Sequence, residues 1–209
     1  MHFTIRSSFA VVALAFSLFL SACSESFTDS RDGQSYGTVK IGEQTWMAEN
    51  LNFETASSFC PEDDSRNCKR LGRLYSWAEA RSVCPEGWRL PTKEDFEALV
   101  AATSEDASLS PSQSLALSRA GSALKARDGW FKKGNGSDVL GFKALPAGYR
   151  GADGKFDGIG GYAYFWSATE DDEFPESLAY YLFLSFSSDA ASLNAFAKED
   201  YRSVRCVMP

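Results

Sequence analysis

Histidine, the side chain that most often transfers protons in enzymes, occurs only once in this sequence of 209 residues, as His2. His2 lies in an N-terminal segment that we expect to be removed. The chain that remains therefore contains no Ser-His-Asp triad, no Cys-His pair and no histidine ligand for a metal. This single observation excludes several classes of hydrolase and metalloenzyme.

Acidic side chains are the second group that could carry chemistry. In their densest run, Glu170, Asp172 and Glu173 are weak candidate ligands for a hard cation such as calcium. We favour the alternative of a solvated acidic loop, and expect no metal and no cofactor. Glycoside hydrolysis needs only two carboxylates at a set separation, but nothing singles out a pair among the 28 acidic residues. We therefore expect no catalysis, and a carboxylate-based hydrolase is the third-ranked hypothesis.

Aromatic residues in the glycine-rich second half are the stronger lead. An exposed flat ring can stack on the apolar face of a sugar, and a tyrosine hydroxyl adds a polar contact. The candidates for such a surface, with one basic neighbour, are Trp130, Tyr149, Arg150, Tyr162 and Tyr164. The alternative is that these rings pack in the core.

Alternation along one predicted strand places some of these rings together. Successive side chains of a strand point to opposite faces. Tyr162, Tyr164 and Trp166 are therefore predicted to share one face, with Phe165 on the other. We expect Trp166 itself to pack in the core.

The N-terminus has the features of an export signal. Arg6 precedes an apolar stretch over residues 9–20, which is shorter than the about 20 residues that a membrane span needs. Leu20-Ser21-Ala22-Cys23 at its end resembles a bacterial lipobox, in which the cysteine is lipidated and becomes the first residue. Ser24, where an aspartate would retain the protein in the inner membrane, favours the outer membrane. The alternative is an ordinary cleaved signal with an incidental cysteine.

Length and composition fit one globular domain behind this leader. The chain is 44% hydrophobic and 23% charged, which excludes collagen-like, coiled-coil and largely disordered classes. The net charge of −7 argues against a nucleic-acid partner. We expect a signal peptide over residues 1–22, lipidated Cys23 with a polar tether to residue 34, and a single domain over residues 35–209.

Four cysteines remain besides Cys23, an even number that indicates disulfides in an exported chain. Cys60 and Cys68 flank a polar, turn-rich stretch, so a local bridge is predicted, and Cys84 would then pair with Cys206. A four-cysteine zinc site is the rival hypothesis, but the gap between the first two cysteines is wide for such a site and the compartment is oxidising.

Sequence patterns predict helices early and strands late. Ser76 and Thr92 are predicted N-caps of two helices, and Pro111 is predicted to begin a third, weaker one. A loop is predicted over residues 53–69. Strands are predicted over residues 36–41, 44–48, 141–145, 162–167, 179–186 and 203–207. This order indicates an α+β fold with a mainly antiparallel, twisted sheet in the second half.

Seven short strings then line up in order along the chain. They are GQSY (33–36), QTWMAENLN (44–52), GRLYSW (72–77), CPEGWRLPT (84–92), LPAGYR (145–150), FWSATE (165–170) and SVRCV (203–207). Together they resemble the Fibrobacter succinogenes major paralogous domain family, from about residue 29 to residue 207. The resemblance implies a C-type-lectin-like fold, frequent attachment to a lipoprotein signal, and a bridge from an early helix to the last strand, which suits Cys84 with Cys206.

The same resemblance does not extend to calcium-dependent sugar binding. Sugar-binding C-type lectins hold calcium through Glu-Pro-Asn-like and Trp-Asn-Asp-like tripeptides, and neither string occurs here. At the place of the second, this chain has Trp166-Ser167-Ala168, which supplies no carboxylate. The leading hypothesis is a monomeric, non-catalytic lipoprotein of the outer membrane that binds a cell-wall or plant polysaccharide. The alternative is a structural or protein-interaction module of the cell envelope with no sugar ligand.

Overall fold

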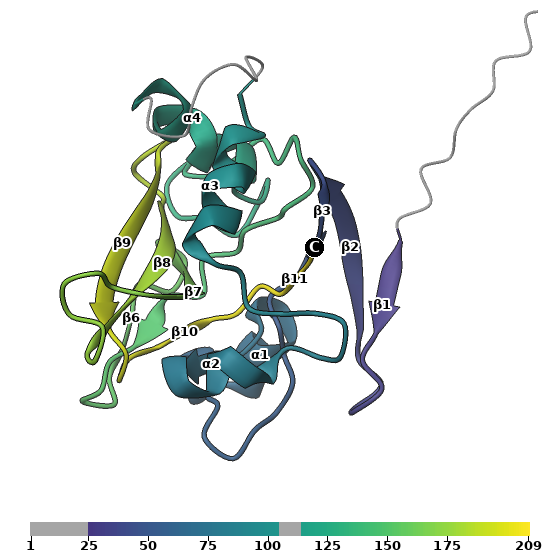
Figure 1. The fold of residues 1–209 in the computed structure, drawn as a ribbon, viewed down its shortest axis with the longest axis vertical. Coiled ribbons are helices and arrows are strands. Elements are labelled where there is room, and N and C mark those ends of the chain that lie inside the picture. The colour runs from purple at the N-terminus through teal and green to yellow at the C-terminus, as the bar shows by residue number, and fades with distance from the viewer. Residues whose placement is uncertain (1–24, 105–113) are drawn as a thin grey trace, which may run out of the picture.

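The computed structural model describes residues 25–104 and 114–209. The predicted signal peptide and the predicted lipidation site Cys23 lie outside the described residues. Figure 1 shows two sheets with helices between and around them, which confirms an α+β fold with mostly antiparallel strands. No helix among the described residues has the length and apolar character that crossing a membrane requires.

The smaller sheet brings the two ends of the domain together. Its strands run in the order β1 (Ser26–Thr28), β2 (Ser35–Ile41), β3 (Gln44–Met47) and β11 (Val207–Met208). The predicted hairpin around Gly42 is confirmed as the β2–β3 pair, and Gly42 adopts a φ of 60° that suits glycine in a tight turn. The last strand pairs with β3, so the C-terminal residues close the sheet.

The expected tether is part of this sheet. Residues 26–34, predicted as part of a polar tether, form β1 and the turn that leads into β2. An ion pair holds this turn: Asp29 is fully buried and accepts hydrogen bonds from the Arg31 guanidinium, at 2.7 Å for the shortest. The polar composition of this stretch did not indicate that it would form a strand and an ordered turn.

The larger sheet carries the long strands. Its strands run in the order β6 (Phe156–Asp157), β5 (Tyr149–Arg150), β10 (Tyr201–Ser203), β7 (Tyr162–Glu170), β8 (Leu178–Ser185) and β9 (Ala191–Ala197), with β4 (Leu74–Ser76) also paired to β10. Only the β10–β7 pair is parallel. The predicted strands over 162–167 and 179–186 are confirmed as β7 and β8.

Capping side chains place the helices. Ser76 accepts a hydrogen bond from the Glu79 backbone, and Thr92 forms a capping box with Asp95, which confirms both predicted starts. The prediction of a loop over residues 53–69 is wrong for its second half, because Asp64 caps a short helix that begins at Ser65 and continues past the predicted loop to Leu71. The helical elements are η1 (Pro61–Asp63), α1 (Ser65–Leu71), α2 (Trp77–Val83), α3 (Lys93–Ala101) and α4 (Ser114–Leu124). The third helix was predicted to begin at Pro111, which lies outside the described residues.

Residues 141–145 do not form the predicted strand. Ala144 makes only an isolated bridge beside Lys125, with hydrogen bonds to Leu124 and Ala126. This segment passes the end of α4 once and then turns away, so it forms no continuous ladder of backbone hydrogen bonds with a neighbouring strand. Its apolar residues pack in the core instead. Residues 203–207 were predicted as one strand, but only the first and last of them lie in strands: Ser203 ends β10 and Val207 begins β11.

The core has two main parts. One lies where α3 and α4 pack on the β7–β8–β9 face that carries Phe165 and Leu182. The other lies around α2, with Trp77, Trp166 and Tyr75 fully or nearly buried. In Figure 1, α3 and α4 lie in the upper part of the molecule, α1 and α2 in the lower part, and β10 passes between them.

Both predicted disulfides are present. Cys60 bonds to Cys68 across eight residues of sequence, and Cys84 bonds to Cys206 across 122 residues. The long bridge joins the end of α2 to the segment just before β11. It therefore links the helical first half covalently to the last strand.

Candidate functional site

The predicted alternation on β7 is confirmed. Tyr162, Tyr164 and Trp166 lie on one face of the strand, while Ala163 and Phe165 are buried on the other. The first two tyrosines keep part of their surface exposed, and Trp166 is fully buried at the base of the same face. This strand therefore presents tyrosines outward and holds the tryptophan within the fold.

Neighbouring strands and loops extend this row of rings. Tyr164 lies 5.3 Å from Tyr149 of β5 and 5.1 Å from Phe183 of β8, between ring centroids. Tyr162 lies 5.9 Å from Phe186, which in turn lies 6.5 Å from Phe131. We call this continuous surface the aromatic face, and its members are Phe131, Tyr149, Tyr162, Tyr164, Tyr181, Phe183 and Phe186.

Phe131 is the most exposed ring of the aromatic face, with 54% of its surface accessible. Its backbone N–H donates to the carbonyl of Gly160 at 2.8 Å. Its ring packs directly on Gly160, where a Cβ would come within 2.4 Å of the ring. Gly160 also has a φ of 77°, so glycine is required there both for the backbone and for the close approach of the ring.

A buried cation supports the aromatic face from below. The Arg202 guanidinium lies 4.6 Å from the ring centroids of Trp166 and Tyr181, and 5.3 Å from that of Tyr164. Its one carboxylate contact among the described residues is Asp200, at 3.2 Å. Burial lowers the pKa of Arg202, and Asp200 offsets only part of this effect. The rings therefore supply much of what stabilises this charge.

Burial favours the neutral form of two tyrosines of the aromatic face, Tyr164 and Tyr181. Burial raises the pKa of Tyr164 and of Tyr181, and the charge of Arg202 opposes the rise in both. A neutral phenol both donates and accepts a hydrogen bond. The face thus combines apolar ring surface with polar groups that suit hydroxylated ligands.

Two predicted site residues do not join the aromatic face. Trp130 is only 6% exposed, and its indole N–H donates to the carbonyl of Ala144 at 3.1 Å, so it belongs to the core. Arg150 points to the opposite side of β5, where its guanidinium lies 4.0 Å from the ring centroid of Phe59. Both were predicted to contact a ligand, and the structure assigns them packing roles.

The acidic candidates are spread along a loop. Glu170 forms an ion pair with Lys198 at 2.8 Å. Asp172 and Glu173 are exposed, and the backbone N–H of Glu173 is bonded to Asp171, as in a turn. Within residues 25–104 and 114–209, no group of three or more histidine, cysteine or acidic side chains is arranged to hold a metal ion.

Four rings of the aromatic face were not among the candidates predicted from the sequence: Phe131, Tyr181, Phe183 and Phe186. Phe183 lies two residues after Tyr181 on β8, so the alternation applied to β7 would have found it. Phe186 follows the end of that strand. Phe131 adjoins Trp130, and only the backbone path of this loop decides which of the two neighbouring rings faces outward.

Comparisons with known proteins place this fold in a sequence family. The family model described as the Fibrobacter succinogenes major domain matches residues 39–208. Comparison with curated proteins and with solved structures gives no match. The matched range covers every ring of the aromatic face and all four cysteines of the two disulfides.

Proposed function

This chain belongs to the Fibrobacter succinogenes major domain family, and we propose that it is a non-catalytic binding protein whose aromatic face holds a carbohydrate. The observation that carries this proposal is the unbroken contact of seven rings on one face, most of them partly exposed. Contiguous exposed apolar surface marks interaction sites in soluble domains. The tyrosine hydroxyls add the polar contacts that a sugar needs.

A neutral polysaccharide suits this surface best. Arg202 and Asp200 are both buried, so no free charge of either residue faces the ligand. Stacking on rings depends little on which sugar is bound, whereas charge would select for acidic or basic chains. Cell-wall and plant polysaccharides of neutral sugars are therefore the expected class.

A protein partner is the second candidate. Strand β9 is the edge of the larger sheet, and its Phe196 is 52% exposed. Edge strands present unpaired backbone groups to other chains. An envelope protein that adds a strand at β9 would cover Phe196 without touching Phe131.

We also infer that the fold is C-type-lectin-like. Two features support this proposal: the long bridge between Cys84 and Cys206, and the closure of the smaller sheet by the last strand, β11. The bridge links the end of an early helix, α2, to the chain just before the last strand, as the family resemblance implies, and the β11–β3 pair sets the last strand beside the N-terminal strands.

Export and lipid attachment at Cys23 complete the proposed function. An outer-membrane lipoprotein with a monomeric domain would present the aromatic face to polysaccharide in the envelope or beyond it. Growth of the producing cells with a labelled fatty acid tests this: label is expected on the wild-type chain and lost from Cys23→Ser. Equal label on both chains would refute the assignment of Cys23.

The binding proposal is tested with the oxidised chain from Ser24 onward, which contains the whole described fold. Retention on insoluble cellulose, xylan and peptidoglycan is measured with calcium and with a chelator. Phe131→Ala and Tyr162→Ala are each expected to weaken retention by about fivefold, the effect of losing one ring contact of about 1 kcal/mol.

The matched control is Phe174→Ala. Phe174 is 58% exposed but lies in the acidic loop, away from the aromatic face. It is expected to leave retention unchanged. Equal losses in all three variants, or no retention of the wild-type chain on any of the polysaccharides, would overturn the carbohydrate proposal and favour a protein partner. Loss with chelator would implicate the acidic loop instead.

A further inference from the structure

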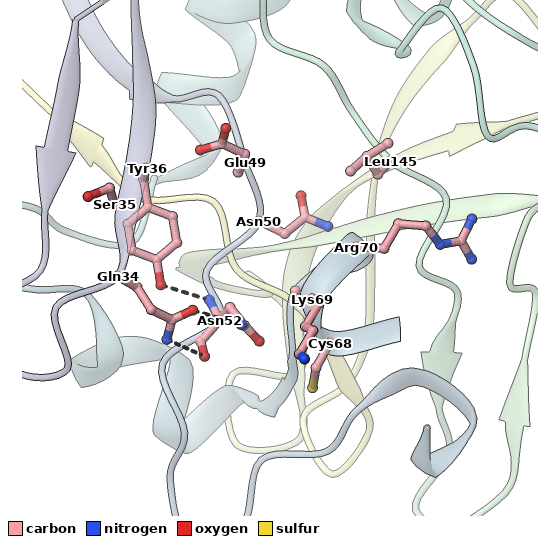
Figure 2. Close-up of a pocket in the computed structure, with 11 residues that line it drawn as sticks. Gln34, Ser35, Tyr36, Glu49, Asn50, Asn52, Cys68, Lys69, Arg70 and Leu145 are labelled. Carbon is pink, nitrogen blue, oxygen red and sulfur yellow. Dashed lines mark hydrogen bonds between the residues drawn. The ribbon is translucent and has the colours of Figure 1, made fainter. Parts of the chain in front are cut away.

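A polar hollow lies apart from the aromatic face, between β2, the segment after β3, and helix α1. Its volume is about 240 Å³. In Figure 2, Gln34, Tyr36 and Asn52 lie on one side, Lys69 and Arg70 extend from α1 on the other, and Glu49 lies near one end. The aromatic face draws on β5, β7 and β8, so the two sites share no residue.

The wall opposite α1 is held by hydrogen bonds. The backbone N–H of Asn52 donates to the Tyr36 hydroxyl at 3.1 Å, and its side-chain Nδ2 donates to Gln34 Oε1 at 2.7 Å. Gln34 Nε2 donates back to the Asn52 carbonyl at 3.1 Å. These three bonds, drawn in Figure 2, fix the amide groups before any ligand arrives.

Two acceptor groups on this wall have unused capacity. Asn52 Oδ1 is buried and has no hydrogen-bond donor among the described residues. Glu49 uses its Oε2 to accept from the Gly37 N–H at 2.6 Å, and its side chain is otherwise exposed. A buried acceptor without a donor is unfavourable. Because Asn52 Oδ1 is closed off from solvent, a ligand hydroxyl would reach it only after the Asn52 side chain moves, whereas the exposed Glu49 carboxylate can accept directly.

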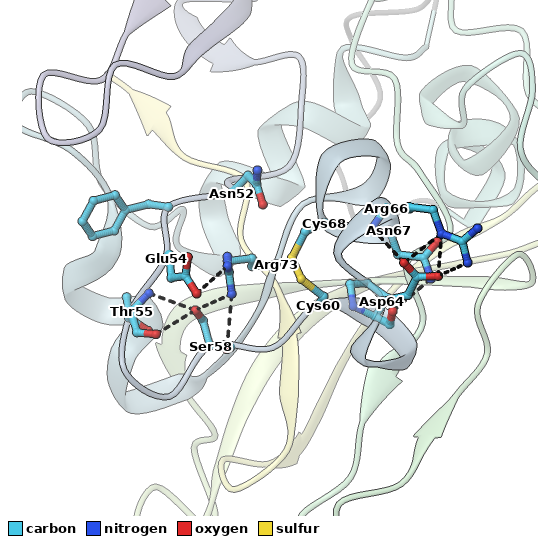
Figure 3. The surroundings of a disulfide bond; sticks show 12 residues. Asn52, Glu54, Thr55, Ser58, Cys60, Asp64, Arg66, Asn67, Cys68 and Arg73 are labelled. Atoms are coloured by element: carbon cyan, nitrogen blue, oxygen red, sulfur yellow. Dashed lines mark hydrogen bonds and ion pairs between the residues drawn. A yellow bond between two sulfur atoms is a disulfide. The ribbon is translucent and has the colours of Figure 1, made fainter.

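The α1 side of the hollow carries two cations without carboxylate partners. Figure 3 shows the neighbouring arginines paired: Arg66 with Asp64 at 2.6 Å, and Arg73 with Glu54 at 2.8 Å. By contrast, Lys69 and Arg70 form no ion pair with any residue of 25–104 or 114–209, and Arg70 contacts only the Asn67 amide oxygen, at 3.3 Å. In a chain of net charge −7, this leaves a local site for an anion.

A second hollow of about 420 Å³ continues from the first along the Cys60–Cys68 disulfide (Figure 3). Gln34, Asn52 and Lys69 line both hollows. Of its acidic residues, Glu54 pairs with Arg73, while Asp32 accepts a hydrogen bond from the neutral Gln34 amide and keeps its negative charge. The two hollows together give room for more than one unit of a chain-like ligand.

We propose that this pair of hollows binds a sugar that carries a carboxylate, such as the hexuronate units of an acidic polysaccharide. The carboxylate pairs with Lys69 and Arg70, and the ring hydroxyls donate to Glu49. Inorganic phosphate offers at most one or two P–OH donors at neutral pH, fewer than a sugar ring, and a neutral sugar leaves both cations unpaired. Only a ligand with both kinds of group uses both walls.

The test is calorimetric titration of the oxidised chain from Ser24 onward with trigalacturonate, and with its methyl ester and inorganic phosphate as comparison ligands. Binding of trigalacturonate is expected, with affinity that falls as salt is added. Lys69→Gln combined with Arg70→Gln is expected to weaken it by about tenfold or more, because two charge-assisted contacts are lost.

Arg66→Gln is the matched control, since Arg66 lies on the same helix but lines neither hollow. It is expected to leave the affinity unchanged. Equal binding of the methyl ester, displacement by phosphate, an equal loss in the control variant or no binding of trigalacturonate would each overturn the proposal. The double variant is expected to keep full retention on neutral xylan, so failure here and failure at the aromatic face are separable.

Discussion

Replacing Asp200 by asparagine tests how the charge of Arg202 is supported beneath the aromatic face. The side chains of Asp200 and Arg202 are 8% and 3% exposed, so solvent screens their interaction very little. Asparagine keeps the volume and the acceptor for the Ala152 N–H, which now bonds to Oδ1 at 3.2 Å. The substitution therefore removes the negative charge and little else.

The magnitude follows from the geometry of the pair. Removing one partner of a buried ion pair destabilises a protein by about 3–5 kcal/mol, because the remaining charge is left without compensation. The contacts of 3.2 and 3.4 Å are longer than the about 2.8 Å of a strong charged hydrogen bond, which favours the lower end, about 3 kcal/mol. Arg202→Met is expected to lower the free energy of unfolding by about 2 kcal/mol. This variant leaves the Asp200 carboxylate buried without a cation, but it also removes the poorly compensated charge of Arg202.

The decisive quantity is the double variant. With Asp200→Asn and Arg202→Met together, no buried charge remains, so the loss is expected to be at least about 1.5 kcal/mol smaller than the sum of the single losses. Urea unfolding of the oxidised chain, followed by tryptophan fluorescence, measures all three. Additive losses within about 0.5 kcal/mol would refute the coupling, and with it the account of how the rings are held.

Three further predictions concern the stability of the fold. Burial raises the pKa of Tyr36 to about 12 from 10, so its contribution to stability is fully present below pH 10 and is lost as the pH rises to 12. Other buried tyrosines lose stability in the same range, so unfolding titrations should show a smaller loss in Tyr36→Phe than in the wild type, and an equal loss would contradict this account. Removing the long disulfide, with Cys84→Ala and Cys206→Ala, is expected to lower the free energy of unfolding by about 5 kcal/mol, because it closes a long loop in the unfolded chain. Removing the short Cys60–Cys68 disulfide is expected to lower it by about 2.5 kcal/mol, and an equal effect of the two would contradict the chain-entropy account. Asp95→Asn is expected to lower the free energy of unfolding by about 2–3 kcal/mol at neutral pH and by progressively less in acid. Burial alone would raise the pKa of Asp95, but hydrogen bonds chiefly from Arg89 outweigh burial and lower the pKa, so the stabilisation is present above pH 3.8 and is lost as the pH falls through the folded-state pKa. An unchanged difference between wild type and variant across that pH range would show that the Asp95 charge is not the source of the stabilisation.

Local signals in the sequence predicted the elements that local chemistry determines. Ser76 and Thr92 bind backbone N–H groups within their own first turns, so their helix starts could be read directly. The β2–β3 hairpin is equally local, because Gly42 supplies the turn. Alternation also put Tyr162 and Tyr164 on one face without knowledge of their neighbours.

Elements that depend on distant partners were not predicted. Strand β9 is rich in alanine, serine and asparagine, which have low strand propensity, and it is extended because it pairs with β8 along its whole length. Strand β1 depends in the same way on β2 and on the Asp29–Arg31 pair. The burial of Trp130 follows from a carbonyl on another segment, that of Ala144, so no pattern around residue 130 could have indicated it.

The long disulfide also determines how the domain would respond to mechanical load. All seven rings of the aromatic face lie between Cys84 and Cys206 in sequence, inside one covalent loop. A pull between the N-terminus and a ligand held at Tyr162 reaches that residue by two covalent routes, through Cys84 and through Cys206. The extension within the loop is limited by the shorter route, through Cys206. Ahead of Cys84 the chain can unravel over its full length except for the loop that the Cys60–Cys68 bridge closes, whereas inside the long loop the extension cannot exceed the stretch from Tyr162 to Cys206.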